Sequence, residues 1–433
     1  MTNIRQGAFT ILRDVEEKKA YSNIAISNYI LKFKPTNAPF LREIVYGTVR
    51  YNMYLDFIIG NFVKTPMEKM QISDKIILRM GLYQLIFMNS VPDYAAVDES
   101  VELAKRFSRG HDSFINGVLR QFLRDREYIV LPDREKDEIE YLSVKYSINK
   151  WIVEMWVEEL GVEETEALMD ALNKTPELCI RPNSLRLSAN DLTERFRERG
   201  FEVAVDDDLP ELLYVKGEGV ITGSLFTSGM FSVQDKGSQS VVKMMAAKPG
   251  DTVIDVCSAP GGKATAMAEG MRNTGKVIAT DIYKRKVDTI EDDAKRLGIK
   301  ILDARCWDAT KTDSSLIEVA DRVLVDAPCS GLGTARRKPE VKYKEFDENM
   351  KRLPEKQLDI LNVSSQYVKP GGILVYSTCT VAKNENEGVV KAFLRRQKEF
   401  DVIERVQLLP HIDGTDGFFI CKMKKSDSLI KGR

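Results

Sequence analysis

The chain has 433 residues, of which 43% are hydrophobic and 30% are charged, and its 64 Lys and Arg nearly balance its 65 Asp and Glu. This composition is typical of a globular protein and excludes a disordered or fibrous chain. The length predicts two or three domains. Because the net charge is −1, any nucleic-acid-binding surface must be local.

The N-terminal residues and the cysteine pattern predict a cytoplasmic protein. The start, MTNIRQGAFT, lacks the charged and then apolar segments of a secretion signal. The long apolar stretch from Ile76 to Met88 contains Arg79 and Gln84, so it predicts a buried helix and not a membrane span. The six cysteines form no CxxC pair and the chain has two histidines, which favours neither a disulfide framework nor a zinc site. We therefore expect reduced cysteines, no metal and no membrane association.

The N-terminal third predicts an all-α domain, residues 1–135. Its apolar side chains recur at helical spacing and indicate roughly four to six packed helices. The polar segment 131–140, which contains Pro132, predicts the end of this domain.

Residues 136–230 are expected to hold linker helices followed by a small α/β module. Segments 178–186 and 201–208 have strand-like patterns, and segment 189–200 between them has a helical pattern that ends at a glycine. This module is too small to be the main catalytic domain.

The remaining residues, 231–433, predict a C-terminal α/β domain with a Rossmann-like, doubly wound parallel sheet. Short β-branched runs alternate with segments long enough for crossover helices. Such sheets bind ligands at the carboxyl ends of their strands, so the residues after each run form the candidate site. The five runs are TVIDV (252–256), KVIAT (276–280), ILDARC (301–306), DRVLV (321–325) and GGILVYS (371–377).

The residues after the first three runs predict a nucleoside site. CSAPGGKAT (257–265) contains two glycines that let the backbone approach a ligand, but it fits neither a P-loop nor a GxGxxG motif. Asp281 follows the second run, where a carboxylate meets ribose hydroxyls, and Asp308 follows the third, where it can meet an adenine amino group. Either aspartate alone is more often a helix cap. Together with the glycine-rich turn, they predict S-adenosylmethionine as the ligand.

The residues after the last two runs add two cysteines to the same edge. DAPCSGLGT (326–334) contains Cys329, and TCT (378–380) contains Cys379. Alone, each is most simply a small buried residue. Beside a methyl donor they predict covalent catalysis on cytosine, because C5 becomes nucleophilic only after a thiolate adds to C6. The spacing does not say which cysteine attacks.

These segments resemble the RNA cytosine-C5 methyltransferases and, within them, the Sun/RsmB-type methyltransferases of 16S rRNA. CSAPGGK, DAPCSGLG and STCT followed by ENE (385–387) are similar to the donor-binding and catalytic motifs of that family. LREIVYGTVR, VPDYAAVDESVELAK and FINGVLR resemble its NusB-like RNA-binding domain. The resemblance covers nearly the whole chain and implies that the small α/β module is a second RNA-binding element. Ser258, Ala264 and Cys421 depart from the usual alanine, threonine and alanine, and none of them removes a chemical role.

The resemblance also implies roles for single residues. Cys379 is similar to the nucleophile of the family, and Cys329 to the cysteine that helps release the methylated base. Asp326, three residues before Cys329, can also bond the N3/N4 edge of cytosine and favour protonation of the ring. The residues that resemble the donor-binding set are Cys257, Ser258, Ala259, Pro260, Gly261, Gly262, Lys263, Asp281, Asp308 and Asp326.

Two basic segments are candidates for RNA contacts. The run ARRKPEVKYK (335–344) has five cations and one glutamate just after the Cys329 motif. Such runs are usually solvated loops, but a place beside the active crevice favours phosphate contacts by Arg336, Arg337 and Lys338. The target cytidine must be unstacked, because C6 cannot be reached within a stacked helix. The second candidate patch is Lys105, Arg106 and Arg109.

The predicted function is therefore methyl transfer from S-adenosylmethionine to C5 of a cytidine in 16S rRNA, by a monomer acting on rRNA free of most ribosomal proteins. One alternative keeps the chemistry and changes the substrate to tRNA or large-subunit rRNA, and the NusB-like region argues against it. Another is a ribosome assembly factor without activity, against which the intact Cys379, Cys329, Asp326 and Lys263 argue. A dehydrogenase is disfavoured because GxGxxG is missing.

Overall fold

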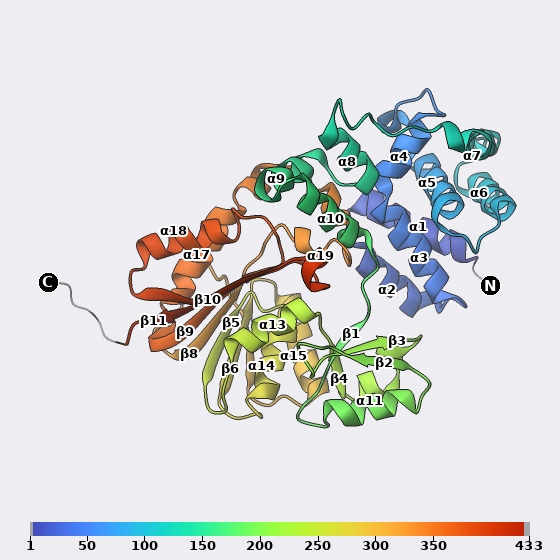
Figure 1. Ribbon diagram of the computed structural model, residues 1–433. Helices are drawn as coiled ribbons and strands as arrows, with labels where there is room; N and C mark the ends of the chain where they lie inside the picture. Colours follow the sequence, from blue (N-terminus) through green and yellow to red (C-terminus); the bar gives the residue numbers. More distant parts are fainter. Residues whose placement is uncertain (1–2, 428–433) are drawn as a thin grey trace. The chain divides into compact units, whose positions relative to one another are not determined.

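The computed structural model describes residues 3–427 and divides the chain into two compact units (Figure 1). The first unit is Met1–Lys174 with Ala335–Glu345, and the second is Thr175–Thr334 with Phe346–Arg433. The expected domain boundaries at 135 and 230 therefore fall inside these units, because the linker helices pack with the N-terminal helices and the small module belongs with the catalytic sheet. In the described residues, no helix is both long and apolar enough to cross a membrane.

The first unit is built around helix α5 (Ile72–Phe87), the buried helix predicted from the sequence. Its Arg79 side chain is buried and forms a two-pronged ion pair with Asp56, with distances of 2.6 and 2.7 Å. Up to Asp125 the described residues form seven α-helices, more than expected. The ends of α1 and α2 were not predicted, because the left-handed residues that end them are Lys19 and Lys34 and not glycines. The other helices are α1 (Ile4–Lys18), α2 (Ser22–Phe33), α3 (Ala38–Arg50), α4 (Asn52–Gly60), α6 (Asp93–Phe107), α7 (Asp112–Asp125), α8 (Glu138–Tyr146), α9 (Lys150–Leu160) and α10 (Val162–Asn173).

The segment Ala335–Glu345 belongs to this helical unit through a buried lysine. The Lys342 ammonium group is buried and donates hydrogen bonds to the carbonyl of Arg50 at 2.7 Å, the carbonyl of Tyr146 at 3.2 Å and Oδ1 of Asn173 at 2.6 Å. Burial holds the pKa of Lys342 well below its ordinary value. The segment is thus a packed part of the first unit and not a solvated loop.

The small module of the second unit is a four-stranded antiparallel sheet with strand order β2-β3-β1-β4. Helix α11 (Ala189–Arg197) begins at a capping box in which Ser188 and Asp191 bond each other's backbone amides. The structure confirms the predicted helix and two strands, and adds two strands that the sequence reading did not identify. The strands are β1 (Cys179–Pro182), β2 (Glu202–Val205), β3 (Leu213–Lys216) and β4 (Phe231–Val233), and α12 (Ser224–Thr227) precedes β4.

The catalytic part of the second unit is a seven-stranded sheet with strand order β10-β11-β9-β8-β5-β6-β7. The five predicted runs form the parallel strands β5 to β9, which confirms the Rossmann-like class. The antiparallel strands β10 and β11 were not predicted. The strands are β5 (Thr252–Val256), β6 (Lys276–Asp281), β7 (Leu302–Cys306), β8 (Ala320–Asp326), β9 (Val368–Thr378), β10 (Phe400–Leu408) and β11 (Phe418–Lys425).

Helices cover both faces of this sheet (Figure 1). Neighbouring residues of β5 show the alternation, because Val253 packs toward one helical layer and Ile254 toward the other. The first layer is α13 (Lys236–Met245), α14 (Gly262–Gly270) and α15 (Lys284–Leu297). The second layer includes α17 (Leu353–Ser365) and α18 (Glu387–Arg396), and the short helices α16 (Glu348–Lys351) and α19 (Pro410–Asp413) complete the unit.

Candidate active site

The register of the parallel strands brings the predicted site residues to one edge of the sheet. Val325 of β8 lies opposite Val256 of β5, which lies opposite Thr280 of β6. One residue further along, Asp326, Cys257 and Asp281 therefore stand in a row at the carboxyl edge. This is the edge at which such sheets bind ligands.

The glycine-rich turn connects β5 to α14. Gly261 has a φ of +100°, a left-handed conformation that favours glycine, and it caps the N-terminus of α14. A Cβ atom on Gly262 would meet only Nε2 of Gln234, at 3.8 Å, so the backbone there stays accessible. Burial raises the pKa of Cys257 to about 12, so its thiol remains neutral.

Asp255 lies fully buried in β5, directly before this turn. Its Oδ2 accepts a hydrogen bond from the Ser258 hydroxyl at 2.9 Å, whereas Oδ1 has no partner in the described part of the chain. Burial, followed by the charge of Asp326, raises the pKa of Asp255 to about 7. Sequence reasoning missed Asp255 because it searched only the residues that follow each strand.

Lys263 and Asp326 form an ion pair at the same edge. Lys263 Nζ lies 2.7 Å from Asp326 Oδ2, and the Ser377 hydroxyl donates to Oδ1 at 2.7 Å. Burial opposes the charge on Lys263, but Asp326 outweighs it and raises the lysine pKa above its ordinary value. Each Asp326 oxygen therefore already accepts one bond and keeps one lone-pair direction free.

Asp281 and Asp308 lie at the ends of β6 and just beyond β7, as predicted. The buried Asp281 accepts a bond from the Tyr283 amide at 3.1 Å through Oδ1, and its Oδ2 lies 3.8 Å from Lys286 Nζ. Asp308 bonds the amide and hydroxyl of Thr310, which lower its pKa. The apolar side chains that follow these strands, Ile282 and Trp307, are exposed, and sequence reasoning did not single them out.

Cys329 and Cys379 meet directly. Their Sγ atoms are 3.2 Å apart, although 50 residues separate them in the chain. The hydrogen bond with Cys379 and burial hold the pKa of Cys329 well above its ordinary value. The raised pKa favours the thiol form of Cys329, and in this contact either sulfur can be the donor.

A buried polar cluster connects the two cysteine loops. Glu385 Oε2 accepts bonds from the Ser330 amide at 2.9 Å and from Gln357 Nε2 at 2.8 Å. The hydroxyls of Ser330 and Thr380 lie 2.8 Å apart, and Asn386 donates to the Thr380 carbonyl at 3.1 Å. The ENE motif marked Glu385 and Asn386 in the sequence, but their contacts become visible only in the fold.

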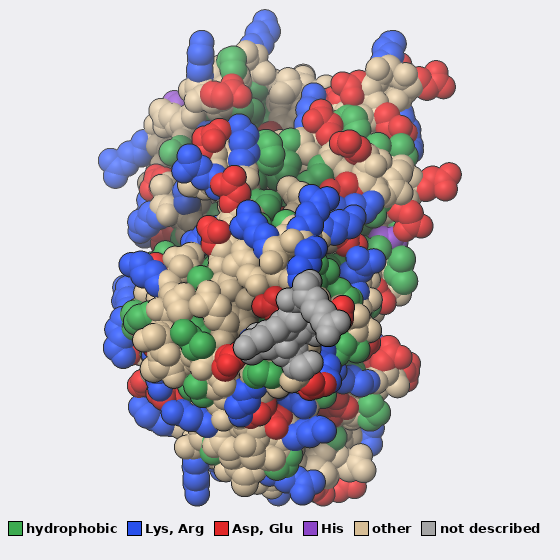
Figure 2. Space-filling model, turned by 90° about the vertical axis from the view of Figure 1, so that its left-hand side faces the viewer, with side chains coloured by type: hydrophobic (Ala, Val, Ile, Leu, Met, Phe, Trp, Pro, Cys, Tyr) green, Lys and Arg blue, Asp and Glu red, His purple; other side chains and the backbone are tan. Residues whose placement is uncertain are grey.

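The candidate RNA-binding residues lie in the helical unit. Arg336 and Arg337 are partly buried, and Lys338 is exposed with its ammonium 5.9 Å from the centre of the Tyr21 ring. Lys342, from the same basic run, cannot reach a phosphate because it is buried. The three residues of the second patch, Lys105, Arg106 and Arg109, are exposed. Figure 2 shows Lys and Arg side chains interspersed with Asp and Glu over one face of the molecule, in keeping with the near-neutral net charge.

Carboxylates and thiols that meet a glycine-rich turn at the carboxyl edge of a Rossmann-like sheet indicate the catalytic domain of a methyltransferase. Comparison with known families agrees with this class. Residues 242–424 match the family described as 16S rRNA methyltransferase RsmB/F, residues 2–124 match the NusB family, and residues 148–222 match the ferredoxin-like domain of RsmF/B-like methyltransferases.

Relatives resemble the chain over its whole length. A Bacillus subtilis protein named "Probable ribosomal RNA small subunit methyltransferase B" is 37% identical, with 98% of this chain and 99% of the relative covered. Ribosomal RNA small subunit methyltransferase B of Erwinia tasmaniensis is 31% identical over 98% and 99% of the two chains. The crystal structure of PH0851 has a TM-score of 0.85 at 28% identity and covers 98% of this chain and 100% of that one. The chain belongs to the RsmB family of ribosomal RNA small subunit methyltransferases.

Proposed function

We propose that this protein methylates C5 of a cytidine in 16S rRNA, with S-adenosylmethionine as donor and a transient covalent bond between Cys379 and C6. The observation that carries this proposal is the 3.2 Å contact between the Cys329 and Cys379 sulfurs, at the edge that holds Asp326. Two adjoining thiols supply both the nucleophile and the group that assists its departure.

The residues at the donor edge fit S-adenosylmethionine. The open space at Gly262 suits close approach of the donor, and Oδ2 of Asp281, which lies 3.8 Å from Lys286 Nζ, can still accept hydrogen bonds from its ribose hydroxyls. Exposed Ile282 and Trp307 offer apolar surface for an adenine ring, with Asp308 nearby in sequence for its amino group. When bound, the donor supplies an electrophilic methyl group. Residues 257–263 and Asp326 complete the proposed donor-binding set.

Cys379 is proposed as the attacking residue because its STCT segment resembles the nucleophile motif of the family. The raised pKa of Cys329 favours a thiol there, which suits a group that assists departure. The Cys379 thiolate forms a bond to C6, and the pair of the C5–C6 double bond moves to C5, which takes the methyl group as the S–CH3 bond of the donor breaks with its pair left on the donor sulfur. A water molecule then takes the C5 proton, the C5–H pair restores the C5–C6 double bond, and the C6–S bond breaks with its pair returned to the Cys379 sulfur. The Cys329 thiol stabilises the departing Cys379 sulfur through the hydrogen bond between them.

Asp326 is proposed to hold the cytosine ring during attack. Its carboxylate is fixed by Lys263 and Ser377 and keeps lone pairs for the N3/N4 edge. Accepting a hydrogen bond from protonated N3 favours addition at C6, because the ring then takes up the electron pair more readily.

The choice of 16S rRNA rests on the named relatives and on the NusB-family match of the helical unit. Arg336, Arg337 and Lys338 are proposed to contact RNA phosphates. The acting form is proposed to be a cytoplasmic monomer that binds 16S rRNA free of most ribosomal proteins.

The test is transfer of labelled methyl from S-adenosylmethionine to unmodified, protein-free 16S rRNA and, in parallel, to tRNA, followed by digestion to nucleosides. The proposal predicts labelled 5-methylcytidine from 16S rRNA alone. Label in tRNA alone would keep the chemistry and contradict the substrate. Label in neither RNA would favour an assembly factor without activity.

A further inference from the structure

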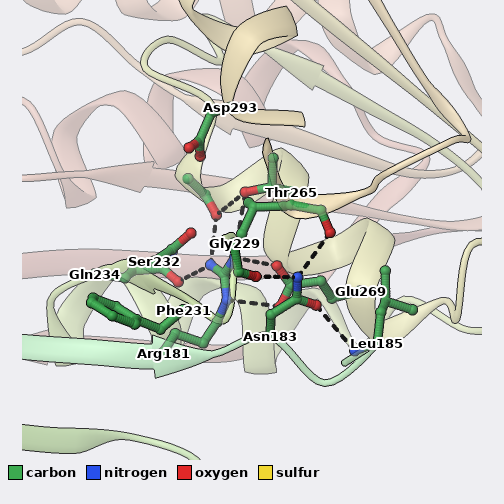
Figure 3. Close-up of polar contacts among 12 residues, drawn as sticks. Arg181, Asn183, Leu185, Gly229, Phe231, Ser232, Gln234, Thr265, Glu269 and Asp293 are labelled. Atoms are coloured by element: carbon green, nitrogen blue, oxygen red, sulfur yellow. Dashed lines mark hydrogen bonds and ion pairs between the residues drawn. The ribbon is translucent and has the colours of Figure 1, made fainter. Parts of the chain in front are cut away.

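A buried arginine of the small antiparallel module extends toward the glycine-rich turn before α14, here called the donor turn. Arg181 lies on β1, and both its side chain and that of Glu269 on α14 are almost fully buried, at 4% and 3% exposure. Figure 3 shows the Arg181 side chain pointing toward Glu269 and Gln234. The module is thus joined to the helix that begins at the glycine-rich turn.

Every N–H group of the Arg181 guanidinium is used inside the protein. Nε and Nη2 donate to the two oxygens of Glu269 at 3.2 and 2.8 Å. Nη1 donates to Oε1 of Gln234 and, at 2.9 Å, to the Gly262 carbonyl, while Nη2 also reaches the Thr265 hydroxyl at 3.4 Å. A guanidinium has five such hydrogens, so none remains for an RNA phosphate.

The bond to Gly262 bears directly on the donor turn. The Gly262 carbonyl belongs to the peptide that links Gly262 to Lys263, the residue paired with Asp326. The Thr265 hydroxyl accepts from Arg181 and lies 3.0 and 3.2 Å from the Gly261 and Gly262 carbonyls. Arg181 therefore contacts the turn both directly and through Thr265.

We propose that Arg181 is a positioning residue for the methyl donor, which holds the Gly261–Lys263 turn in its binding conformation from the neighbouring module. The module then forms part of the donor site, in addition to the RNA-binding role that the resemblance implies for it. This proposal rests on the proposed use of S-adenosylmethionine. A fixed turn lowers the free-energy cost of binding because its conformation is not ordered at the moment of binding.

A second arginine offers a matched control. Arg296 of α15 also joins the module to the catalytic sheet, through bonds to the carbonyls of Phe226 at 2.8 Å and Phe231 at 3.0 Å. It pairs with Asp293 and makes no bond to the donor turn. A purely structural role of such anchors would make both arginines equivalent.

The experiment compares Arg181→Lys, the double variant Arg181→Met/Glu269→Met, and Arg296→Lys. If Arg181→Lys fails to fold, the double variant still tests the proposal. It removes both buried charges together and so leaves neither of them unpaired. Calorimetry measures the Kd for S-adenosylmethionine without RNA, gel shift measures the Kd for 16S rRNA, and hydrogen exchange follows the amides of residues 262–266 without ligand.

The Arg181 variants should bind the donor about tenfold more weakly, or worse, because a displaced turn misplaces the ligand. They should also exchange the turn amides faster, while RNA affinity and the Arg296→Lys donor affinity stay unchanged. Equal donor affinity in a folded Arg181 variant would overturn this proposal and leave the proposed function intact. A wild-type protein that does not bind S-adenosylmethionine would overturn both.

Discussion

Asp255 lies near the carboxyl edge of the parallel sheet, where its carboxyl group is affected both by burial and by nearby charges. Its carboxyl group is fully buried, one oxygen has no hydrogen-bond partner among the described residues, and its pKa is raised to about 7. Between about pH 4 and pH 7 the folded protein keeps a proton on Asp255 that the unfolded chain has lost. The contribution of Asp255 to the free energy of unfolding therefore falls as the pH rises through this range.

Replacing Asp255 by Asn should remove this pH dependence. One pKa unit corresponds to about 1.4 kcal/mol, so the stability of Asp255→Asn relative to wild type should rise by up to about 4 kcal/mol from pH 4 to pH 8. Urea unfolding of both proteins across this range measures the difference. Asp191→Asn is a control whose stability relative to wild type should change with pH in the opposite direction, because hydrogen bonds from Ser188 lower the pKa of Asp191. A relative stability of Asp255→Asn that does not change with pH would contradict the raised pKa.

The sequence predicted site residues wherever a general rule connects position with chemistry. Asp281, Cys329 and Cys379 follow strands of a parallel sheet, and such positions share one edge. Glu385 and Arg181 could not be placed in the same way. Their partners lie 55 and 88 residues away, and no local pattern encodes such distances.

At the scale of elements, the parallel strands were predictable and the antiparallel pair was not. The parallel strands β5 to β9 are apolar runs separated by crossover helices, which is a strong local signal. Strand β10 carries mostly exposed side chains, so its residues have no apolar run to mark them. It forms because β11 offers it a backbone partner, a contact that appears only in three dimensions.

The packing of the charged segment Ala335–Glu345 could likewise not be predicted from its sequence. Its sequence predicted exposed cations that contact phosphates, yet the first unit buries Lys342 because backbone and side-chain oxygens from three helical regions accept its hydrogen bonds. No pattern in the run itself specifies these acceptors.

Lys342→Met should destabilise the protein by about 2 kcal/mol, since a side chain of similar length leaves Oδ1 of Asn173 without its donor and removes one of the hydrogen bonds that the Arg50 and Tyr146 carbonyls accept. Chemical denaturation followed by circular dichroism measures this loss. Lys338→Met is the matched control on the same segment, and its exposed side chain predicts a change below about 0.5 kcal/mol. Equal stability of the two variants would show that the Lys342 bonds do not stabilise the unit.

For the whole molecule, RNA binding must come from local clusters because the net charge is −1. Reversing the charges of Arg336 and Arg337 should weaken 16S rRNA binding and leave donor binding intact. The slope of log affinity against log salt should fall by about one for each RNA phosphate that the variant no longer neutralises. Filter binding at several salt concentrations measures both quantities.

The control for this variant is Lys284→Glu/Lys295→Glu on α15, which changes the net charge equally at exposed positions. Thermal melts of both variants separate loss of binding from loss of folding. Unchanged RNA affinity in a folded Arg336→Glu/Arg337→Glu protein would exclude these two residues from the RNA surface.

The proposed covalent bond between Cys379 and C6 of cytidine can be tested by trapping the intermediate. Cys329→Ala protein is incubated with protein-free 16S rRNA and S-adenosylmethionine, and the slow band on a denaturing gel is digested with nuclease and protease for mass spectrometry. We expect a methylated cytidine attached to the peptide that contains Cys379. Attachment to another residue, or methyl transfer retained by Cys379→Ala, would contradict it.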